Sequence, residues 1–238
     1  MASLAFGSAC EGTPFLAHAD SGRLKARPKS GGTTSARGQS ALRLGGTRDA
    51  ILIMPSVIPT TPLPLLVMLH GAGGSADRFL QRFGTLPEET GLPMLFVDSR
   101  GQTWDGIRGG FGPDVDFLDA ALEKVFGMVA VDPNRLALGG FSDGATYALS
   151  LGLVNGDLFP RIVAYSPGFL VDGEFHGKPR VFISHGTADD ILPIDRCSRV
   201  IVPDLKKRGY DVTFKEFEGG HEVPRAIAEQ GFIFVRAF

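Results

Sequence analysis

Short apolar runs recur along most of this chain, and longer segments with helical spacing separate them. A run that is apolar at every position is typical of a strand buried on both faces, as in a parallel sheet. Alternation of such strands with helices predicts a doubly wound, mostly parallel α/β sheet with helices on both faces, whose ligands bind beyond the carboxyl ends of the strands. The expected strands cover residues 65–69, 94–97, 136–138, 162–165, 181–183 and 212–217, and the expected helices cover 76–83, 114–129, 143–154 and 194–208.

The beginning of the chain has a different composition. Residues 1–39 are rich in Gly, Ser, Thr, Ala and Arg and show no apolar period, so we expect a flexible or loosely packed segment there. Apolar runs at 41–44 and 50–54, separated by glycines, predict an antiparallel hairpin ahead of the parallel strands. Residues 40–238 are long enough to bury one core, which predicts a single α/β domain.

Charge and hydropathy exclude several classes of partner. A formal net charge of −2 and a pI near 6.2 leave no basic surface for nucleic acid or for an anionic membrane. No apolar run approaches the roughly 18 residues of a membrane span, and the first residues lack the features of a secretory signal. We therefore expect a soluble cytoplasmic protein in which Cys10 and Cys197 are free thiols.

The strongest chemical signal is the pentapeptide Gly140-Phe-Ser-Asp-Gly144, which has the pattern G-x-S-x-G. It lies directly after the expected strand at 136–138 and directly before an expected helix. A serine on such a sharp turn exposes its hydroxyl above the sheet, and the flanking glycines let neighbouring chain approach. The pentapeptide alone can arise by chance in a chain with 32 glycines. Its strand-turn-helix context is what favours Ser142 as a nucleophile.

A serine nucleophile needs a general base, and the chain has five histidines. His18 and His176 lie in polar segments and are typical of solvated surface residues. His70 and His185 each precede a glycine at a strand end, where an imidazole can brace a loop. His221 follows the last expected strand in a Gly-Gly-His loop before a terminal helix. The chain order Ser, Asp, His favours His221 as the base.

The third member must be a carboxylate that orients the imidazole. Asp189 and Asp190 both follow the expected strand at 181–183, and only one of them can hold the same imidazole. Each could instead serve as a turn or helix-cap residue. The spacing around them, without further information, leaves both open.

An oxyanion hole requires two backbone N–H groups aimed at the tetrahedral oxygen. One is expected from Asp143, the residue after the nucleophile, and the other from the loop 70–75, which reads H-G-A-G-G-S after the first parallel strand. A glycine-rich loop can also bind phosphate, but the chain has neither G-x-x-x-x-G-K-[ST] nor a fitting G-x-G-x-x-G. We therefore do not expect nucleotide binding.

These motifs, in this order, resemble the α/β-hydrolase superfamily, and within it the small phospholipase/carboxylesterase-type and dienelactone-hydrolase-like esterases. The resemblance covers about residues 63–224. It implies that Ala72, after L-H-G, supplies the second oxyanion N–H, and that Asp189, the first Asp of H-G-x-x-D, is the catalytic acid. The acyl-protein thioesterase subgroup reads G-F-S-Q-G where this chain has Asp143, so the resemblance favours an ester over a thioester.

The substrate pocket is less legible in the sequence. The segment 100–111 follows a strand and is rich in glycine, which places it near the same edge of the sheet. Trp104 and Phe111 could form an apolar wall of the pocket, or they could close the core, since both residue types are commonly buried. Larger relatives insert a cap between 165 and 178, where this chain has only a short connection. An open cleft without a cap domain is therefore expected.

Together these expectations describe a serine carboxylesterase that acts through an acyl-enzyme on short or medium acyl esters, with a small-molecule ester as its partner. No metal and no organic cofactor are required for that chemistry. A thioesterase or lysophospholipase, a small peptidase and a catalytically silent ligand-binding module remain alternatives.

Overall fold

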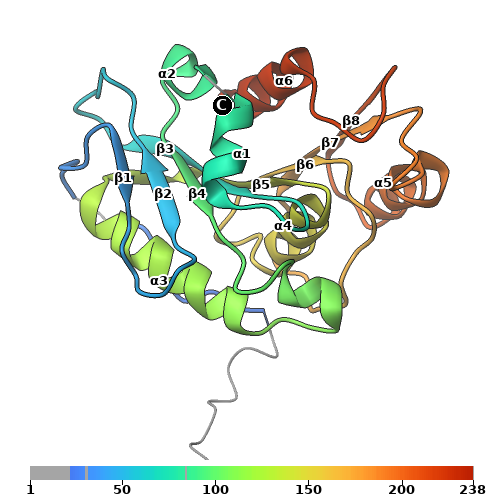
Figure 1. Cartoon of the computed structure of the whole chain (residues 1–238), viewed down its shortest axis with the longest axis horizontal. Helices are drawn as coiled ribbons and strands as arrows, with labels where there is room; N and C mark the ends of the chain where they lie inside the picture. The colour runs from blue at the N-terminus through green and yellow to red at the C-terminus, as the bar shows by residue number, and fades with distance from the viewer. Residues whose placement is uncertain (1–21, 30–31, 84, 238) are drawn as a thin grey trace, which may run out of the picture.

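A computed structural model describes residues 22–29, 32–83 and 85–237 (Figure 1). Eight strands form one sheet in the order β1-β2-β4-β3-β5-β6-β7-β8. The first two strands pair antiparallel and β2 also runs antiparallel to β4, whereas all the later pairs are parallel. The strands are β1 (Gln39–Ala41), β2 (Ala50–Ile53), β3 (Leu63–Leu69), β4 (Met94–Val97), β5 (Val131–Phe141), β6 (Arg161–Tyr165), β7 (Arg180–Gly186) and β8 (Val212–Phe217).

The predicted α/β class, the hairpin and each predicted parallel strand are therefore confirmed, but the first hairpin strand covers residues 39–41 and not the apolar run at 41–44. Every residue of β3, β4 and β6 is buried, as expected for strands covered on both faces. Within the sheet, β3 has β4 as its neighbour on one side and β5 on the other. The loops after β3 and β5 thus diverge at a topological switch point, where doubly wound sheets bind their ligands.

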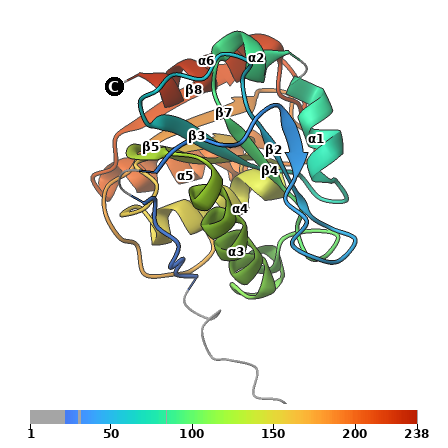
Figure 2. The same ribbon diagram turned by 90° about the vertical axis from the view of Figure 1, so that its left-hand side faces the viewer.

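Helices cover both faces of this sheet, as Figure 1 and the rotated view in Figure 2 show. One apolar cluster joins the sheet to α1, α2 and α6, and two further clusters join its other face to α3, α4 and α5. Leu65, Val67 and Leu69 point to one face, and Leu66 and Met68 point to the other. The helices are α1 (Ala76–Phe83), α2 (Leu86–Thr90), α3 (Pro113–Met128), α4 (Asp143–Val154), α5 (Ser198–Lys207) and α6 (Arg225–Arg236), with short 3₁₀ turns η1 (Asp105–Arg108) and η2 (Ile194–Arg196).

The expected helix at 194–208 is interrupted. It consists of η2 and α5, which are separated at Cys197, a residue with φ −116° and ψ −102° that are not helical. The sequence reading did not anticipate α2 or η1. Both are short, so neither produces an apolar period long enough to detect. Residues 166–179 connect β6 to β7 without helix or strand, which fits the expected absence of a cap domain.

The segment predicted to be loosely packed is described from Gly22 onward, apart from residues 30–31, and Cys10 and His18 lie outside the described residues. Residues 22–29 contain no helix or strand, yet Leu24 is buried in the core beside α3 and α4. The Leu24 N–H donates to the Asn155 side chain, which in turn donates to the Gly22 carbonyl. Side-chain hydrogen bonds thus fasten a segment that no apolar period could reveal.

Candidate active site

The turn between β5 and α4 carries Ser142 in an unusual backbone conformation. Its φ of 59° and ψ of −124° are sparsely populated for a residue with a side chain. The turn leaves no room for a side chain at its two glycines. A Cβ on Gly140 would lie 2.2 Å from the Gly144 carbonyl oxygen, and a Cβ on Gly144 would lie 2.1 Å from the Leu69 carbonyl oxygen. Only glycine at these two positions lets β3, β5 and α4 approach so closely that the serine stands at the end of the sheet.

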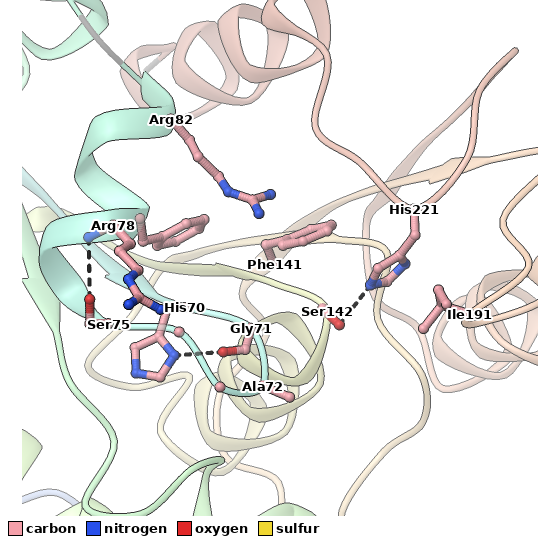
Figure 3. A pocket seen from close by; sticks show the side chains of 13 residues that line it. His70, Gly71, Ala72, Ser75, Arg78, Arg82, Phe141, Ser142, Ile191 and His221 are labelled. Atoms are coloured by element: carbon pink, nitrogen blue, oxygen red, sulfur yellow. Dashed lines mark hydrogen bonds between the residues drawn. The ribbon is translucent and has the colours of Figure 1, made fainter.

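Three segments distant in sequence meet at this serine. The Ser142 hydroxyl donates to His221 Nε2 at 2.7 Å, and His221 Nδ1 donates to Asp189 Oδ2 at 2.7 Å. Figure 3 shows the imidazole of His221 pointing at the Ser142 hydroxyl. The structure therefore brings together the three residues that the sequence singled out, in the geometry by which a base activates a hydroxyl.

The loop after β7 distinguishes the two candidate carboxylates. Asp189 is buried and its Oδ1 accepts the backbone N–H groups of Ile191 and Leu192, while Oδ2 faces His221. Asp190 is exposed, and the structure shows no contact between it and His221. Burial opposes a charge on Asp189, but hydrogen bonds from His221 and Leu192 outweigh it and lower the pKa of this carboxyl. Asp189 is thus held as a carboxylate beside the imidazole.

A second histidine contacts the same carboxylate. His185 is fully buried, and its Nε2 lies 2.7 Å from the Leu192 carbonyl oxygen and 3.2 Å from Asp189 Oδ2. Both partners are acceptors, so Nε2 carries the proton, and Nδ1 accepts from the Ser198 hydroxyl at 2.7 Å. Burial lowers the pKa of His185, which keeps this imidazole neutral.

Backbone contacts hold the His221 loop against the Asp189 loop. The Thr187 N–H donates to the Phe217 carbonyl, and the Ala188 N–H donates to the Gly219 carbonyl, both at 2.9 Å. A Cβ on Gly186 would lie 2.3 Å from the Gly220 carbonyl oxygen, so the two loops touch through their main chains. The separation between the histidine and the carboxylate is thereby set by the backbone.

The loop after β3 is braced from below by His70. Its Nδ1 donates to the Gly71 carbonyl at 2.7 Å, and its Nε2 accepts from the Ser99 N–H at 3.1 Å. Arg48, from the hairpin loop, adds a hydrogen bond to the Gly74 carbonyl at 2.9 Å. Burial lowers the pKa of His70 and keeps it neutral. The bracing role suggested for His70 by its position therefore agrees with its contacts.

The two expected oxyanion donors come from the loop after β3 and from the first residue of α4. Ala72 and Ser142 line the same cavity, and Asp143 is the first residue of α4, where a backbone N–H has no partner within the helix. The Asp143 carboxylate accepts from the Thr103 hydroxyl at 2.5 Å. The Asp143 side chain therefore points toward the loop after β4, an orientation that the sequence did not predict.

A cavity of about 420 Å³ opens at the serine (Figure 3). The loop after β3 and the helix α1 form one wall, and Phe141, Ile191 and His221 form the other. The sequence analysis did not predict that Arg78, Arg82 and Ile191 line this cavity. The spacing of four between the two arginines, on the helix that follows the glycine-rich loop, is the signal that could have found them.

Trp104 and Phe111 are not among the residues that line this cavity, so the reading of these two as a pocket wall is corrected. Trp104 is fully buried, stacks on Tyr147 with ring centroids 5.1 Å apart, and donates its indole N–H to the His70 carbonyl at 2.8 Å. Phe111 is also buried and packs edge-on against Tyr147. Both aromatics belong to the core cluster shared with α3 and α4, where their apolar surface is removed from water.

Within the described residues, no group of three or more His, Cys, Asp or Glu side chains is arranged to hold a metal ion. In the same part of the chain, no helix is both long and apolar enough to cross a membrane. The chemistry available at the cavity is that of a hydroxyl, an imidazole and a carboxylate in hydrogen-bonded sequence.

Comparison with known proteins bears on the family. The model of a family described as phospholipase/carboxylesterase matches residues 109–235. The putative esterase NocK of Nocardia uniformis subsp. tsuyamanensis is 28% identical over 188 residues, which cover 74% of this chain and 54% of that protein. Acyl-protein thioesterase 1 of Gibberella zeae is 34% identical over 108 residues, which cover 41% of this chain and 46% of that protein. The chain spans about half the length of these curated relatives.

A solved structure agrees at the level of the fold. The Bacillus cereus carboxylesterase superposes with a TM-score of 0.62 at 20% sequence identity, covering 82% of this chain and 96% of that chain. At this identity the likeness concerns the arrangement of the sheet and helices.

Proposed function

Because this chain belongs to the phospholipase/carboxylesterase family of α/β-hydrolase esterases, we propose that it hydrolyses carboxylic esters through an acyl-enzyme formed on Ser142. The supporting observation is the unbroken line of two 2.7 Å hydrogen bonds from Ser142 to His221 and from His221 to Asp189. Short or medium acyl esters suit the open cavity, which no cap covers in the described part of the chain.

In the first half-reaction, His221 Nε2 takes the proton of the Ser142 hydroxyl as the oxygen attacks the ester carbonyl. The carbonyl oxygen becomes an oxyanion, which the N–H groups of Ala72 and Asp143 stabilise, with the positive end of α4 directed at it. His221 then gives its proton to the departing alcohol, and the acyl group remains on Ser142.

In the second half-reaction, His221 takes a proton from water as the water oxygen attacks the acyl carbonyl, and it then gives that proton to the Ser142 oxygen as the bond to the acyl carbon breaks and the carboxylic acid leaves. Asp189 balances the imidazolium in both halves. Its contacts with Ile191 and Leu192 hold the carboxylate in place while the charge on the imidazole changes.

A thioester substrate is the second candidate, because an acyl-protein thioesterase matches part of the chain. The two candidates share the acyl-enzyme and differ only in the leaving group. Comparing kcat/KM for butyrate esters with that for butyryl thioesters separates them, and a clear preference for the thioester would replace the ester proposal.

The proposal is tested with p-nitrophenyl esters of increasing acyl length, assayed on the wild type and on Ser142→Ala. Loss of the nucleophile is expected to lower kcat by several orders of magnitude, roughly 10⁴-fold or more. A fluorophosphonate probe should label the wild type and leave the variant unlabelled, with Ser56→Ala, which replaces an exposed serine outside the cavity, as a control that retains Ser142. Near-normal hydrolysis by Ser142→Ala, or a folded wild type that neither labels nor hydrolyses, would contradict the proposal.

A further inference from the structure

Two arginines of α1 stand at the wall of the cavity that contains the proposed nucleophile. Arg78 and Arg82 are four residues apart, so they project from the same side of the helix, and both line the cavity with Ser142. Phe79 and Phe83 are buried against the sheet and fix the rotation of α1. Figure 3 shows both guanidinium groups on the α1 side of the nucleophile. Two positive charges thus face the reaction site from a rigid element.

Within the described residues, no carboxylate balances these charges. None of the thirteen residues that line the cavity is Asp or Glu. In the described part of the chain, neither Arg78 nor Arg82 has a carboxylate oxygen within 4.0 Å. Like charges four residues apart on a helix repel each other, so the pair carries a cost that a bound anion would remove. By contrast, ion pairs of this kind are formed by Arg23, Arg27, Arg48, Arg180, Arg199, Arg208 and Arg225, among others.

Arg82 is also positioned close to the reacting groups. Its guanidinium carbon lies 5.3 Å from the centre of the Phe141 ring, and that ring lies 4.7 Å from the His221 ring. A guanidinium over an aromatic face keeps its N–H donors in its own plane, where they can bind a carboxylate or phosphate in bidentate fashion. Phe141 immediately precedes Ser142, so an anionic group bound there would lie beside the carbonyl that Ser142 is proposed to attack.

The opposite end of the cavity is apolar. Ile191 is 65% exposed although it is a large aliphatic residue, and it lines the cavity beyond His221. Figure 3 shows Ile191 and the two arginines on opposite sides of Ser142. A ligand that spans the cavity therefore meets positive charge at one end and apolar surface at the other.

We propose that the ester hydrolysed by this enzyme carries an anionic group, a carboxylate or a phosphate, which binds Arg78 and Arg82 while the scissile carbonyl lies at Ser142. This inference rests on the proposed ester hydrolysis and adds the charge of the substrate. Surface ion pairs are individually weak, but two guanidinium groups acting together on one anion give a measurable preference.

The experiment compares esters that differ only in charge. In the first pair, mono-p-nitrophenyl adipate carries a carboxylate at the end of the acyl chain, where p-nitrophenyl hexanoate has a methyl group. In the second pair, 4-acetoxybenzoate carries a carboxylate on the alcohol side of the ester, where 4-acetoxybenzamide has a neutral amide. Each pair is assayed on the wild type, on the double variant Arg78→Gln/Arg82→Gln and on the control Arg236→Gln. The control removes an exposed arginine of α6 that does not line the cavity. Rates with Ser142→Ala are subtracted as background.

For at least one pair, the double variant is expected to lose about ten-fold more kcat/KM on the anionic ester than on its neutral partner, chiefly through KM. The Arg236→Gln control should leave both rates unchanged, and Arg78→Lys/Arg82→Lys should keep part of the preference. Raising NaCl on the wild type should reduce the anionic-to-neutral ratio, because salt screens exposed charges. This measurement needs no variant to fold.

Equal losses on charged and neutral esters in both pairs, together with a salt-independent ratio, would overturn the charge proposal and leave ester hydrolysis standing. Absence of Ser142-dependent hydrolysis of every ester would instead overturn the proposed function. The pair that responds identifies the side of the scissile bond that bears the charge.

Discussion

His185 Nε2 lies 3.2 Å from Oδ2 of Asp189, the same oxygen that lies 2.7 Å from His221 Nδ1. One carboxylate oxygen therefore receives N–H groups from two imidazoles. One of them faces Ser142, and the other is buried and fixed by Ser198 and Leu192. We infer that His185 positions Asp189 without touching the reacting atoms.

Replacing His185 with leucine is expected to lower kcat/KM about 10- to 100-fold, because groups behind a catalytic residue orient it through hydrogen bonds. His185→Gln should retain more activity, since its amide N–H can replace Nε2–H. Rescue by the conservative variant distinguishes positioning from general destabilisation: if His185 acts through its hydrogen bond to Asp189, kcat should be higher in His185→Gln than in His185→Leu at comparable midpoints of thermal unfolding. Equally reduced kcat in both variants would indicate a purely structural role.

Asp189→Asn and Asp190→Asn should have very different effects. The first variant is expected to lower kcat roughly 10³- to 10⁴-fold, on the scale known for serine proteases in which this carboxylate becomes an amide. The second replaces an exposed side chain and should leave kcat within about two-fold of the wild type. Steady-state kinetics on one p-nitrophenyl ester measures both. A larger loss in Asp190→Asn than in Asp189→Asn would reverse the assignment.

Gly144→Ala is expected to reduce the free energy of unfolding by roughly 3 kcal/mol or more, because overpacking against main chain leaves little room for relaxation. The added Cβ would lie 2.1 Å from the Leu69 carbonyl oxygen. Gly127→Ala is the matched control, since nothing lies within 4 Å of its Cβ and it sits in α3. That change should add about 0.5–1 kcal/mol, as helix glycines generally do when replaced by alanine. Urea unfolding compares the variants, and equal midpoints would contradict the steric argument.

Asp157 links the early segment to the domain in a pH-dependent way. Hydrogen bonds from Arg23, with a contribution from the charge of Arg27, lower the pKa of Asp157 from 3.8 to about 2. Because the pKa is lower in the folded protein, the stabilisation is fully present above pH 3.8 and is lost as the pH falls toward 2.

Asp157→Asn should therefore lower the free energy of unfolding at pH 7 by about 0.5–1 kcal/mol, a modest value because the pair is at the surface. The difference from the wild type should shrink as the pH is lowered from 3.8 toward 2. Thermal unfolding across that range provides the measurement, and a difference that grows toward acid pH would refute the ion pair as its source.

The parallel strands could be predicted because burial on both faces leaves an unmistakable apolar run in each of them. Ser142, Asp189 and His221 could be predicted for a related reason: each follows such a run, and the carboxyl ends of parallel strands meet at one edge. The choice of Asp189 over Asp190 depended on the resemblance, because adjacent residues at a strand end differ in direction only once the loop is folded.

Other features depend on contacts that a linear pattern does not contain. Leu24 is a single apolar residue in a polar segment. Its burial is accompanied by hydrogen bonds of the Asn155 side chain to the backbone of Gly22 and Leu24, more than 130 residues away in sequence. The sequence left Trp104 facing either a ligand or the core. The His70 carbonyl offers the indole N–H a hydrogen-bond acceptor inside the core, which makes burial of this side chain favourable. The side on which Arg78 and Arg82 project depends on how α1 rotates against the sheet.

The tight main-chain contacts at Gly140, Gly144 and Gly186 have a consequence for how this protein can be altered. The groups proposed to react are confined by backbone packed on backbone, which tolerates almost no variation, whereas the cavity walls on α1 and at position 191 consist of replaceable side chains. Selection for a new ester can therefore act on the walls alone. Mutant libraries directed at positions 78, 82 and 191 should yield altered preferences while the machinery of bond cleavage stays intact.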